Sequence, residues 1–204
     1  MTERQFDFLF SKANVLMNET KDANHNWDHI ERVIENIEKI RLELPQKIQE
    51  IMDDKVLKLA AAWHDISYAF FESGFVQFFQ ESKRSVKIFN DFLKEAKIAK
   101  SEADLMKDVV RTHTGSQFGL LNRGRSFYHQ LVQDADTIEV FFRERLERAI
   151  KLAEEGNVFW KFAVEIYKPL TYNWYLKHYN FMYNLPGIVK KLEAENKIAI
   201  YHGK

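Results

Sequence analysis

Two adjacent residues about a third of the way along the chain have side chains that could bind a divalent metal ion. His64 and Asp65 follow an apolar run of helix-forming residues, Ala60 to Trp63. A buried imidazole beside a carboxylate costs free energy unless something pairs with it, and a divalent cation is one such partner. Two further pairs of metal-binding residue types flank them, upstream and downstream: His25 with His29, and Asp134 with Asp136.

The His-Asp pair can serve one ion only from a particular place on its helix. On a regular helix the side chains of neighbouring residues diverge by about 100°. Both side chains can reach one ion only if it lies at the helix end, where the chain turns. The residues that follow, Ile66 to Tyr68, are expected to leave the helix and enter a loop, which allows this arrangement.

Each flanking pair leaves alternatives open. His25 and His29 are spaced i, i+4, so on one helix they would share a face and could bind a metal together. If His25 lies in the first turn, its ring would instead support the site from outside, and either histidine could also be exposed or satisfied in the core. Asp134 and Asp136 point in different directions, so we expect one metal ligand of the two. Their structural alternative is helix capping.

The bulk composition is that of an ordinary globular domain. The chain has 204 residues, of which 46% are hydrophobic and 29% charged, enough for one well-filled domain and too few for two comfortable ones. Lys+Arg and Asp+Glu number 30 each, and the formal net charge of zero argues against a nucleic-acid polymer as the main partner. It does not argue against a small anionic substrate, because a few local cations suffice for one phosphate group.

The absence of cysteine restricts the chemistry of any metal site. With no thiolates in the chain, a metal must be held by histidines and carboxylates. The N-terminus is charged and lacks the apolar core of a signal peptide, and no run approaches the roughly 18 to 20 apolar residues of a spanning helix. We therefore expect a cytoplasmic protein with no membrane partner.

The spacing of apolar residues predicts an all-α fold. Gly and Pro are scarce, at 7 and 3, and apolar residues recur at helical intervals. The predicted helices span residues 6–16, a cap at Asp22 or Asn24 to about 44, and then 46–64, 81–97, 101–113, 126–134, 136–155 and 185–196. We expect an aromatic loop over residues 67–80 beside the His-Asp pair, either a lid or a packed corner of the core. A short strand-like alternation occupies residues 198–201.

Together these stretches resemble the HD superfamily of metal-dependent phosphohydrolases. The pattern of that family is a histidine, then a His-Asp pair about two helices later, then a distant aspartate. In this chain His29 matches the first element, His64 and Asp65 match the second, and Asp136 matches the last. The chain departs from the pattern after that aspartate, with Glu139 where many relatives carry Asp.

The resemblance implies a fold, a metal site and an activity. The fold is a single-domain HD-type helical bundle over residues 1–204, with a metal-binding core at about 21–143 and a C-terminal helical extension at about 157–204. The implied metal ligands are His29, His64, Asp65 and Asp136, supported by His25 and Asp134. Such a mixed set suits Mn, Fe, Co, Ni, Zn or Mg. The implied activity is attack of metal-activated water on phosphorus in a small phosphorylated molecule. A nucleotide is the leading substrate, and phosphomonoesterase, phosphodiesterase and pyrophosphatase all stay open.

Other residues acquire candidate roles from the same resemblance. His113 matches an Ile-x-x-His segment of relatives, which implies contact with substrate phosphate, orientation of water or a second ion; the alternative is a polar residue that ends a helix. Glu72 and Glu81 are candidates to orient the attacking water. The cations that could hold phosphate oxygens, each of which could equally be a surface charge, are Arg32, Lys83, Arg84 and Arg111.

Two other classes of function stay open at this stage. The first is a helical binding or regulatory module that keeps the metal site but not turnover. The second is an all-α scaffold in which the His-Asp pair is a coincidence. A homodimer is compatible with each of these functions.

Overall fold

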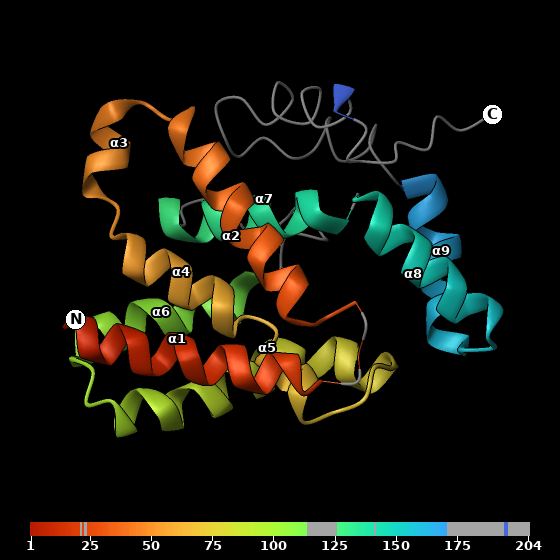
Figure 1. Ribbon diagram of the computed structural model, residues 1–204, viewed down its shortest axis with the longest axis horizontal. Helices are drawn as coiled ribbons and strands as arrows, with labels where there is room; N and C mark the ends of the chain where they lie inside the picture. The colour runs from red at the N-terminus through yellow and green to blue at the C-terminus, as the bar shows by residue number, and fades with distance from the viewer. Residues whose placement is uncertain (21, 23, 114–125, 141, 171–193, 196–204) are drawn as a thin grey trace.

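The computed structural model describes residues 1–20, 22, 24–113, 126–140, 142–170 and 194–195. Within these ranges the chain is helical and forms no strand, so the predicted all-α fold is confirmed (Figure 1). The elements are α1 (Glu3–Asn18), α2 (Trp27–Leu42), α3 (Gln46–Ile51), α4 (Asp54–Trp63), the 3-10 helix η1 (Ile66–Ala69), α5 (Phe75–Glu95), α6 (Lys100–Thr112), α7 (Phe127–Val140), α8 (Arg143–Glu154) and α9 (Val158–Leu170). The helix predicted at 185–196 and the stretch 198–201 lie outside the described residues, apart from 194 and 195.

Helix α2 begins later than predicted because Asn26, rather than Asp22 or Asn24, caps it. Asn26 is extended (φ −116°, ψ −176°), and its side chain accepts a hydrogen bond from the backbone N–H of His29 at 3.2 Å. Asp22 instead accepts hydrogen bonds from the backbone N–H groups of Asn24 (2.8 Å) and His25 (3.0 Å), which closes a turn ahead of the helix. His29 therefore lies in the first turn of α2 and His25 lies before it, so the two do not share a helix face.

The helix predicted over residues 46–64 is in fact two helices. Met52 is extended (φ −90°, ψ 128°), and Asp53 caps α4 by accepting a hydrogen bond from the backbone N–H of Lys55 at 2.8 Å. An aspartate that can bond nearby backbone N–H groups favours a helix start over a helix interior. Ile51 is 66% exposed because the chain turns immediately after it.

The boundary predicted between residues 134 and 136 does not exist, because α7 continues through it. The helix keeps Ala135 and Ile138 buried on one face and ends only at Val140. Phe142 is extended (φ −61°, ψ 134°) and precedes α8. Asp136 therefore belongs to the middle of a helix, which fixes its direction more firmly than a loop would.

The aromatic stretch at residues 67–80 is also more helical than predicted. It opens with η1, and α5 begins at Phe75 rather than near Glu81. The rings of Phe75 and Phe78 lie 5.5 Å and 6.0 Å from the ring of Phe159 in α9. This contact joins segments far apart in the chain, so the local sequence gives no sign of it.

Two groups of buried residues form the core, and α2 and α4 contribute to both. One group joins α2 to α4 and α7, and includes Ile37, Leu57 and Leu131. The other joins α4 to α1, α5 and α6, and includes Leu59 and other fully buried side chains. Figure 1 shows α2 crossing α7 and α4 lying over α6. Complete burial of a leucine contributes about 1.5–3 kcal/mol, so this packing holds α2, α4 and α7 in fixed positions.

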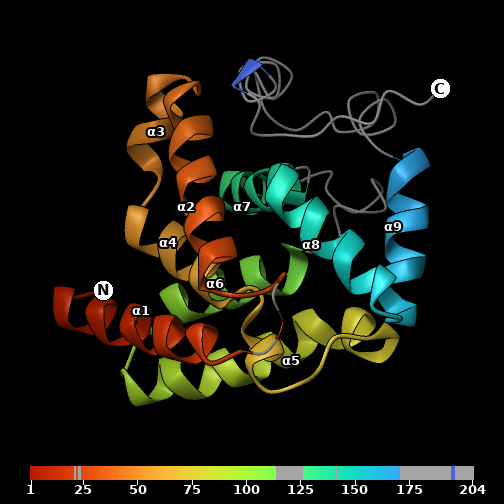
Figure 2. The same cartoon turned by 45° about the vertical axis from the view of Figure 1, so that its right-hand side comes forward.

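Helices α8 and α9 pack against each other as a hairpin beside this core (Figure 2). Their shared apolar cluster contains Ala149, Ala153, Trp160, Ala163 and Val164. A short connection after Glu154 passes through Gly156, whose φ of +99° suits glycine. None of the helices in the described part of the chain is long and apolar enough to cross a membrane.

Candidate metal centre

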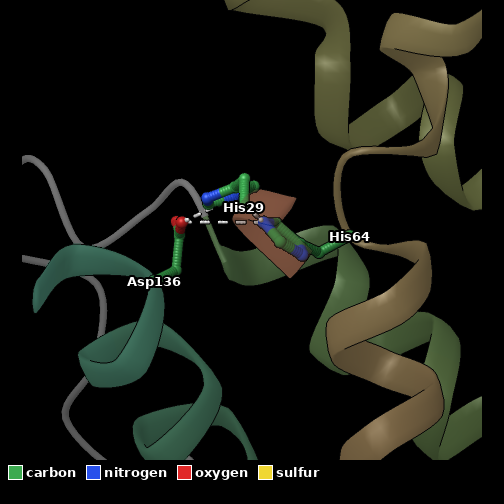
Figure 3. A group of neighbouring side chains, drawn as sticks. All are labelled: His29, His64 and Asp136. Atoms are coloured by element: carbon green, nitrogen blue, oxygen red, sulfur yellow. Dashed lines mark hydrogen bonds and ion pairs between the residues drawn. The ribbon is translucent and has the colours of Figure 1, made fainter. Parts of the chain in front are cut away.

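Three separate helical segments bring the four predicted metal ligands together. His29 comes from the first turn of α2, His64 and Asp65 from the end of α4, and Asp136 from the middle of α7. Figure 3 shows the two imidazole rings and the Asp136 carboxylate converging on one point. Both histidines are fully buried, and Asp65 is 4% exposed.

The ligand atoms are close enough to share one ion. The Nε2 atom of His29 lies 3.2 Å from Nε2 of His64, 3.3 Å from Oδ2 of Asp65 and 3.5 Å from Oδ1 of Asp136. The Nε2 atom of His64 lies 3.2 Å from Oδ2 of Asp65 and 3.6 Å from Oδ1 of Asp136. Metal–ligand bonds to nitrogen and oxygen are about 2.0–2.2 Å, so an ion among these four atoms needs only small adjustments. His29, His64 and Asp136 form a group able to hold a metal ion.

The end of α4 explains how neighbouring residues serve one point. His64 keeps helical dihedrals (φ −63°, ψ −39°), whereas Asp65 leaves the helix (φ −106°, ψ 12°). This turn lets the two side chains face the same side, as the sequence predicted. The backbone carbonyl of Asp65 then accepts a hydrogen bond from the N–H of Tyr68 at 2.9 Å, which starts η1.

Hydrogen bonds at the far side of each ring orient the metal-facing nitrogens. The Nδ1–H of His64 donates to the carbonyl of Ala61 at 2.6 Å, which directs Nε2 toward Asp65 and Asp136. The Nδ1 of His29 lies 2.9 Å from Oε2 of Glu139, so that Nδ1–H donates to a carboxylate. Metal-binding histidines in proteins are usually held by such a bond from the other ring nitrogen.

The electrostatics of the group favour a cation. Burial alone would raise the pKa of Asp65 and lower the pKa of His64. The attraction between the two groups, together with hydrogen bonds from His113 and His29 to Asp65 and from His64 to Asp136, outweighs burial, so the pKa of Asp65 lies well below its ordinary value and that of His64 well above it. Burial also raises the pKa of Asp136, but its contact with His64 lowers it overall. Two carboxylates held as buried anions beside imidazoles form a donor set that fits a divalent metal.

His113 forms a second group with the same His-Asp pair. Its Nε2 lies 3.3 Å from Oδ1 of Asp65 and 3.7 Å from Oε1 of Glu81. Its Nδ1–H donates to the carbonyl of Val110 at 2.6 Å, which directs Nε2 toward the carboxylates. His64, Asp65 and His113 make up the second set of residues with the spacing to hold a metal ion.

Glu81 is buried beside this second group. Its Oε2 accepts a hydrogen bond of 2.5 Å from the hydroxyl of Tyr68. Burial, and then the negative charge of Asp65, raise the pKa of Glu81 to about 7. A carboxyl group with such a pKa can accept and release a proton near neutral pH.

The two residues predicted to support the site have different surroundings. The Nδ1 of His25 lies 3.1 Å from Oδ1 of Asp22, and its ring stacks on Tyr68 with centroids 3.8 Å apart. Asp134 is fully buried in α7, burial raises the pKa of its carboxyl well above the ordinary value, and neither oxygen has a hydrogen-bond partner in the described part of the chain. The carboxylate that contacts Nδ1 of His29 is therefore Glu139, five residues after Asp134 on α7.

The cations proposed for phosphate and the second candidate base are scattered. Arg32 donates from Nε to Oε1 of Glu139 at 2.8 Å, and Arg84 donates to Oε1 of Gln77 at 2.6 Å and lies over the Phe71 ring. Three further candidates are exposed on the loop before α5, on α5 and on α6, respectively: Glu72, Lys83 and Arg111.

Glu139 and Arg145 are the buried residues that the sequence analysis did not place at the site. Glu139 is fully buried; burial raises its pKa, but Arg145 and then His29 outweigh this and hold the pKa well below the usual range. Its position three residues after Asp136 puts both on one helix face, which is a readable signal. Arg145 carries no such signal, because only the packing of α8 brings it near His29.

The structure combines an all-helical fold with a centre of two imidazoles and two carboxylates. The sequence pattern of the HD domain family matches residues 26–140, which is more than half of the chain and contains all four predicted ligands. The chain belongs to the HD domain family. Neither a search of curated proteins nor a search of solved structures found a match.

Proposed function

We propose that this protein is a metal-dependent phosphohydrolase that acts on a small phosphorylated molecule. The observation that carries the proposal is the convergence of two imidazole nitrogens and two carboxylate oxygens, separated by 3.2 to 3.6 Å, in a chain of the HD domain family. A nucleotide is the substrate we propose first, because its phosphate would bind a divalent ion held by these four residues.

His29, His64, Asp65 and Asp136 would hold the ion. A divalent cation there would supply Lewis-acid activation of water and of a phosphoryl oxygen. The rings of His29 and His64 are already held by Glu139 and by the carbonyl of Ala61, so their donor atoms face the ion position before it binds. Mn, Fe, Co, Ni, Zn and Mg all accept such a mixed nitrogen and oxygen set.

We assign proton transfer to Glu81 and His113. The hydroxyl of Tyr68 holds Oε2 of Glu81, which leaves Oε1 facing Nε2 of His113 at 3.7 Å. Glu81 would take a proton from the attacking water at Oε1. His113, 3.3 Å from Asp65, would orient that water or hold a phosphate oxygen.

Arg84 is the cation that we retain for phosphate binding. It lies three residues after Glu81 on α5, so the two side chains share a helix face. Its Nη1 donates to Gln77, whose Nε2 in turn donates to Oγ of Ser67 at 2.6 Å, two residues after Asp65. This chain of hydrogen bonds links Arg84 to η1, which follows the His-Asp pair.

The test is metal analysis combined with a substrate screen. Protein purified without added metal should contain a divalent ion, and nucleotides and generic phosphoesters should be hydrolysed with Mn²⁺, Co²⁺, Ni²⁺ or Mg²⁺. The His64→Ala variant is the control that should lose both. A protein that binds metal and phosphorylated ligands but releases no phosphate would be a binding or regulatory module instead. A protein without metal affinity would refute the proposal.

A further inference from the structure

Arg145 brings a fixed positive charge to the metal centre from outside the matched HD region. It lies in the first turn of α8, beyond residue 140 where the family match ends, and is 9% exposed. Its Nη1 donates a short hydrogen bond to Oε2 of Glu139 and lies 3.0 Å from Nδ1 of His29. Its Nη2 lies 3.2 Å from Nε2 of His25 and donates a hydrogen bond there.

We propose that Arg145 is a positioning residue of the metal centre, which fixes His29 through Glu139 and fixes His25 directly. The proposal deepens the proposed function, because it rests on His29 as a metal ligand. The match to the HD family does not include Arg145, because α8 follows the matched residues.

Glu139 is the residue through which Arg145 acts on His29. Its Oε1 accepts from Nε of Arg32 at 2.8 Å, and its Oε2 accepts from both Arg145 and Nδ1–H of His29. The guanidinium therefore holds the same oxygen that orients the His29 ring. Without Arg145 that oxygen loses its charged partner, and a fully buried carboxylate can shift toward Arg32 and away from His29.

A second line of contacts runs from Arg145 toward the proposed base. His25 receives the Nη2 bond, and its ring lies parallel to Tyr68, with centroids 3.8 Å apart and 3° between the planes. The hydroxyl of Tyr68 donates to Glu81. Trp160 of α9 lies on His25 as well, with centroids 6.0 Å apart. Through Arg145 and Trp160, the α8–α9 hairpin thus contacts His29 and His25. His25 in turn stacks on the tyrosine that holds Glu81.

The geometry requires arginine rather than any cation. A guanidinium presents two terminal nitrogens in a rigid fork, and here one serves Glu139 and the other serves His25. A lysine ammonium is a single point and cannot occupy both places. Arg145→Lys should therefore keep the charge but restore only part of the function.

Arg148 provides a matched control on the same helix. It lies one turn further along α8 and is partly buried, and its Nε and Nη2 have no hydrogen-bond partner in the described part of the chain. Arg148→Gln removes an arginine from α8 that makes no hydrogen bond to Glu139 or His25 in the described part of the chain.

The experiment compares Arg145→Gln, Arg145→Lys and Arg148→Gln with the full wild-type chain. The dissociation constant for Mn²⁺ is measured by calorimetry on metal-free protein, alongside kcat and KM. Loss of a residue that holds a metal-binding histidine typically weakens metal affinity by about 10- to 100-fold. We expect that loss in Arg145→Gln, an intermediate value in Arg145→Lys and the wild-type value in Arg148→Gln.

A spectroscopic readout separates this proposal from the proposed function. In metal-free protein the Nδ1–H proton of His29 should give a protected downfield signal in nitrogen-edited NMR, which Arg145→Gln broadens or shifts and Arg148→Gln leaves in place. If wild-type protein binds no metal, the proposed function fails, yet this comparison still decides whether Arg145 orders His29.

Three results would overturn the role of Arg145. One is wild-type metal affinity together with an unchanged His29 signal in Arg145→Gln. Another is wild-type affinity in Arg145→Lys, which would also decide the matter if the glutamine variant fails to fold. A loss of thermal stability alone, with metal affinity and the His29 signal unchanged, would likewise show that the residue has only a structural role.

Discussion

Asp65 and His113 face each other across the end of α4, with Oδ1 of the carboxylate 3.3 Å from Nε2 of the imidazole. The other oxygen of Asp65, Oδ2, faces His29 and His64 instead. One carboxylate therefore belongs to both groups of side chains that could hold a metal, and its removal should affect both at once.

The first prediction follows from that shared position. Asp65→Ala should abolish metal retention and also destabilise the fold, because three buried histidines lose their common counter-charge; breaking a buried ionic contact of this kind costs about 3–5 kcal/mol. Metal content per chain and the denaturant midpoint are the measurements. Asp91→Ala, which removes an exposed carboxylate of α5, is the control and should change neither. Full metal content in purified Asp65→Ala would exclude this residue as a ligand.

The second prediction concerns His113. His113→Ala should lower turnover by about 10² to 10⁴, the range for loss of a positioned proton-transfer group, while the ion stays bound because His29, His64, Asp65 and Asp136 remain. Turnover and metal per chain are measured on the same sample. A drop from two ions to one would instead make His113 a ligand of a second metal. Unchanged turnover per folded molecule would reduce His113 to a structural residue.

The third prediction concerns the dependence of stability on pH. The pKa of Glu81 is about 7 in the folded protein against an ordinary value of 4.5, so between these values the folded state holds a proton that the unfolded state releases. The free energy of unfolding of metal-free protein should therefore fall as pH rises through this window and level off above about pH 7. Glu81→Gln cannot titrate and should lack this component.

Urea denaturation of wild type and Glu81→Gln at a series of pH values isolates the component as the difference between the two curves. Parallel curves would contradict the raised pKa. The same variant should lose turnover by about 10² to 10⁴ if Glu81 is the base, and wild-type activity in it would move that role elsewhere.

The fourth prediction concerns removal of the metal. Chelation should lower the melting temperature and abolish hydrolysis, and addition of the ion at 100 times its dissociation constant should restore about 2.7 kcal/mol of stability. Calorimetric melts of chelated and reloaded protein provide the measurement. His64→Ala is the control, and its melting temperature should not change when the ion is added. A melting temperature of wild type that does not respond to metal would show that no ion binds the folded state.

The residues that converge at the candidate metal centre could be picked out from the sequence, because residue type carries the chemistry. The apolar run before His64 and the turn after Asp65 indicated a buried pair at a helix end, and the structure has both features. Glu139 could have been found from its three-residue spacing to Asp136 on α7. Arg145 could not, because the packing of the α8–α9 hairpin decides where its side chain lies.

Helix boundaries were harder to predict than helix identity. Asp53 and Asn26 each compete for backbone N–H groups, and several nearby residues, Asp22 and Asn24 among them, could have done the same. Which of these residues caps the helix depends on which face of the helix packs against the core. The continuation of α7 through Ala135 and the early start of α5 at Phe75 have the same cause, since tertiary packing overrides local preference at both places.

The scattering of the ligands along the chain has a kinetic consequence. His29 belongs to α2 and Asp136 to α7, so the centre exists only after segments distant in the chain have docked, which is a late event in folding. An ion bound there would cross-link α2 and α7 and would have to dissociate before the two helices can separate. Metal should therefore slow unfolding while leaving the refolding rate almost unchanged, and the lifetime of the folded protein would follow the supply of metal in its surroundings.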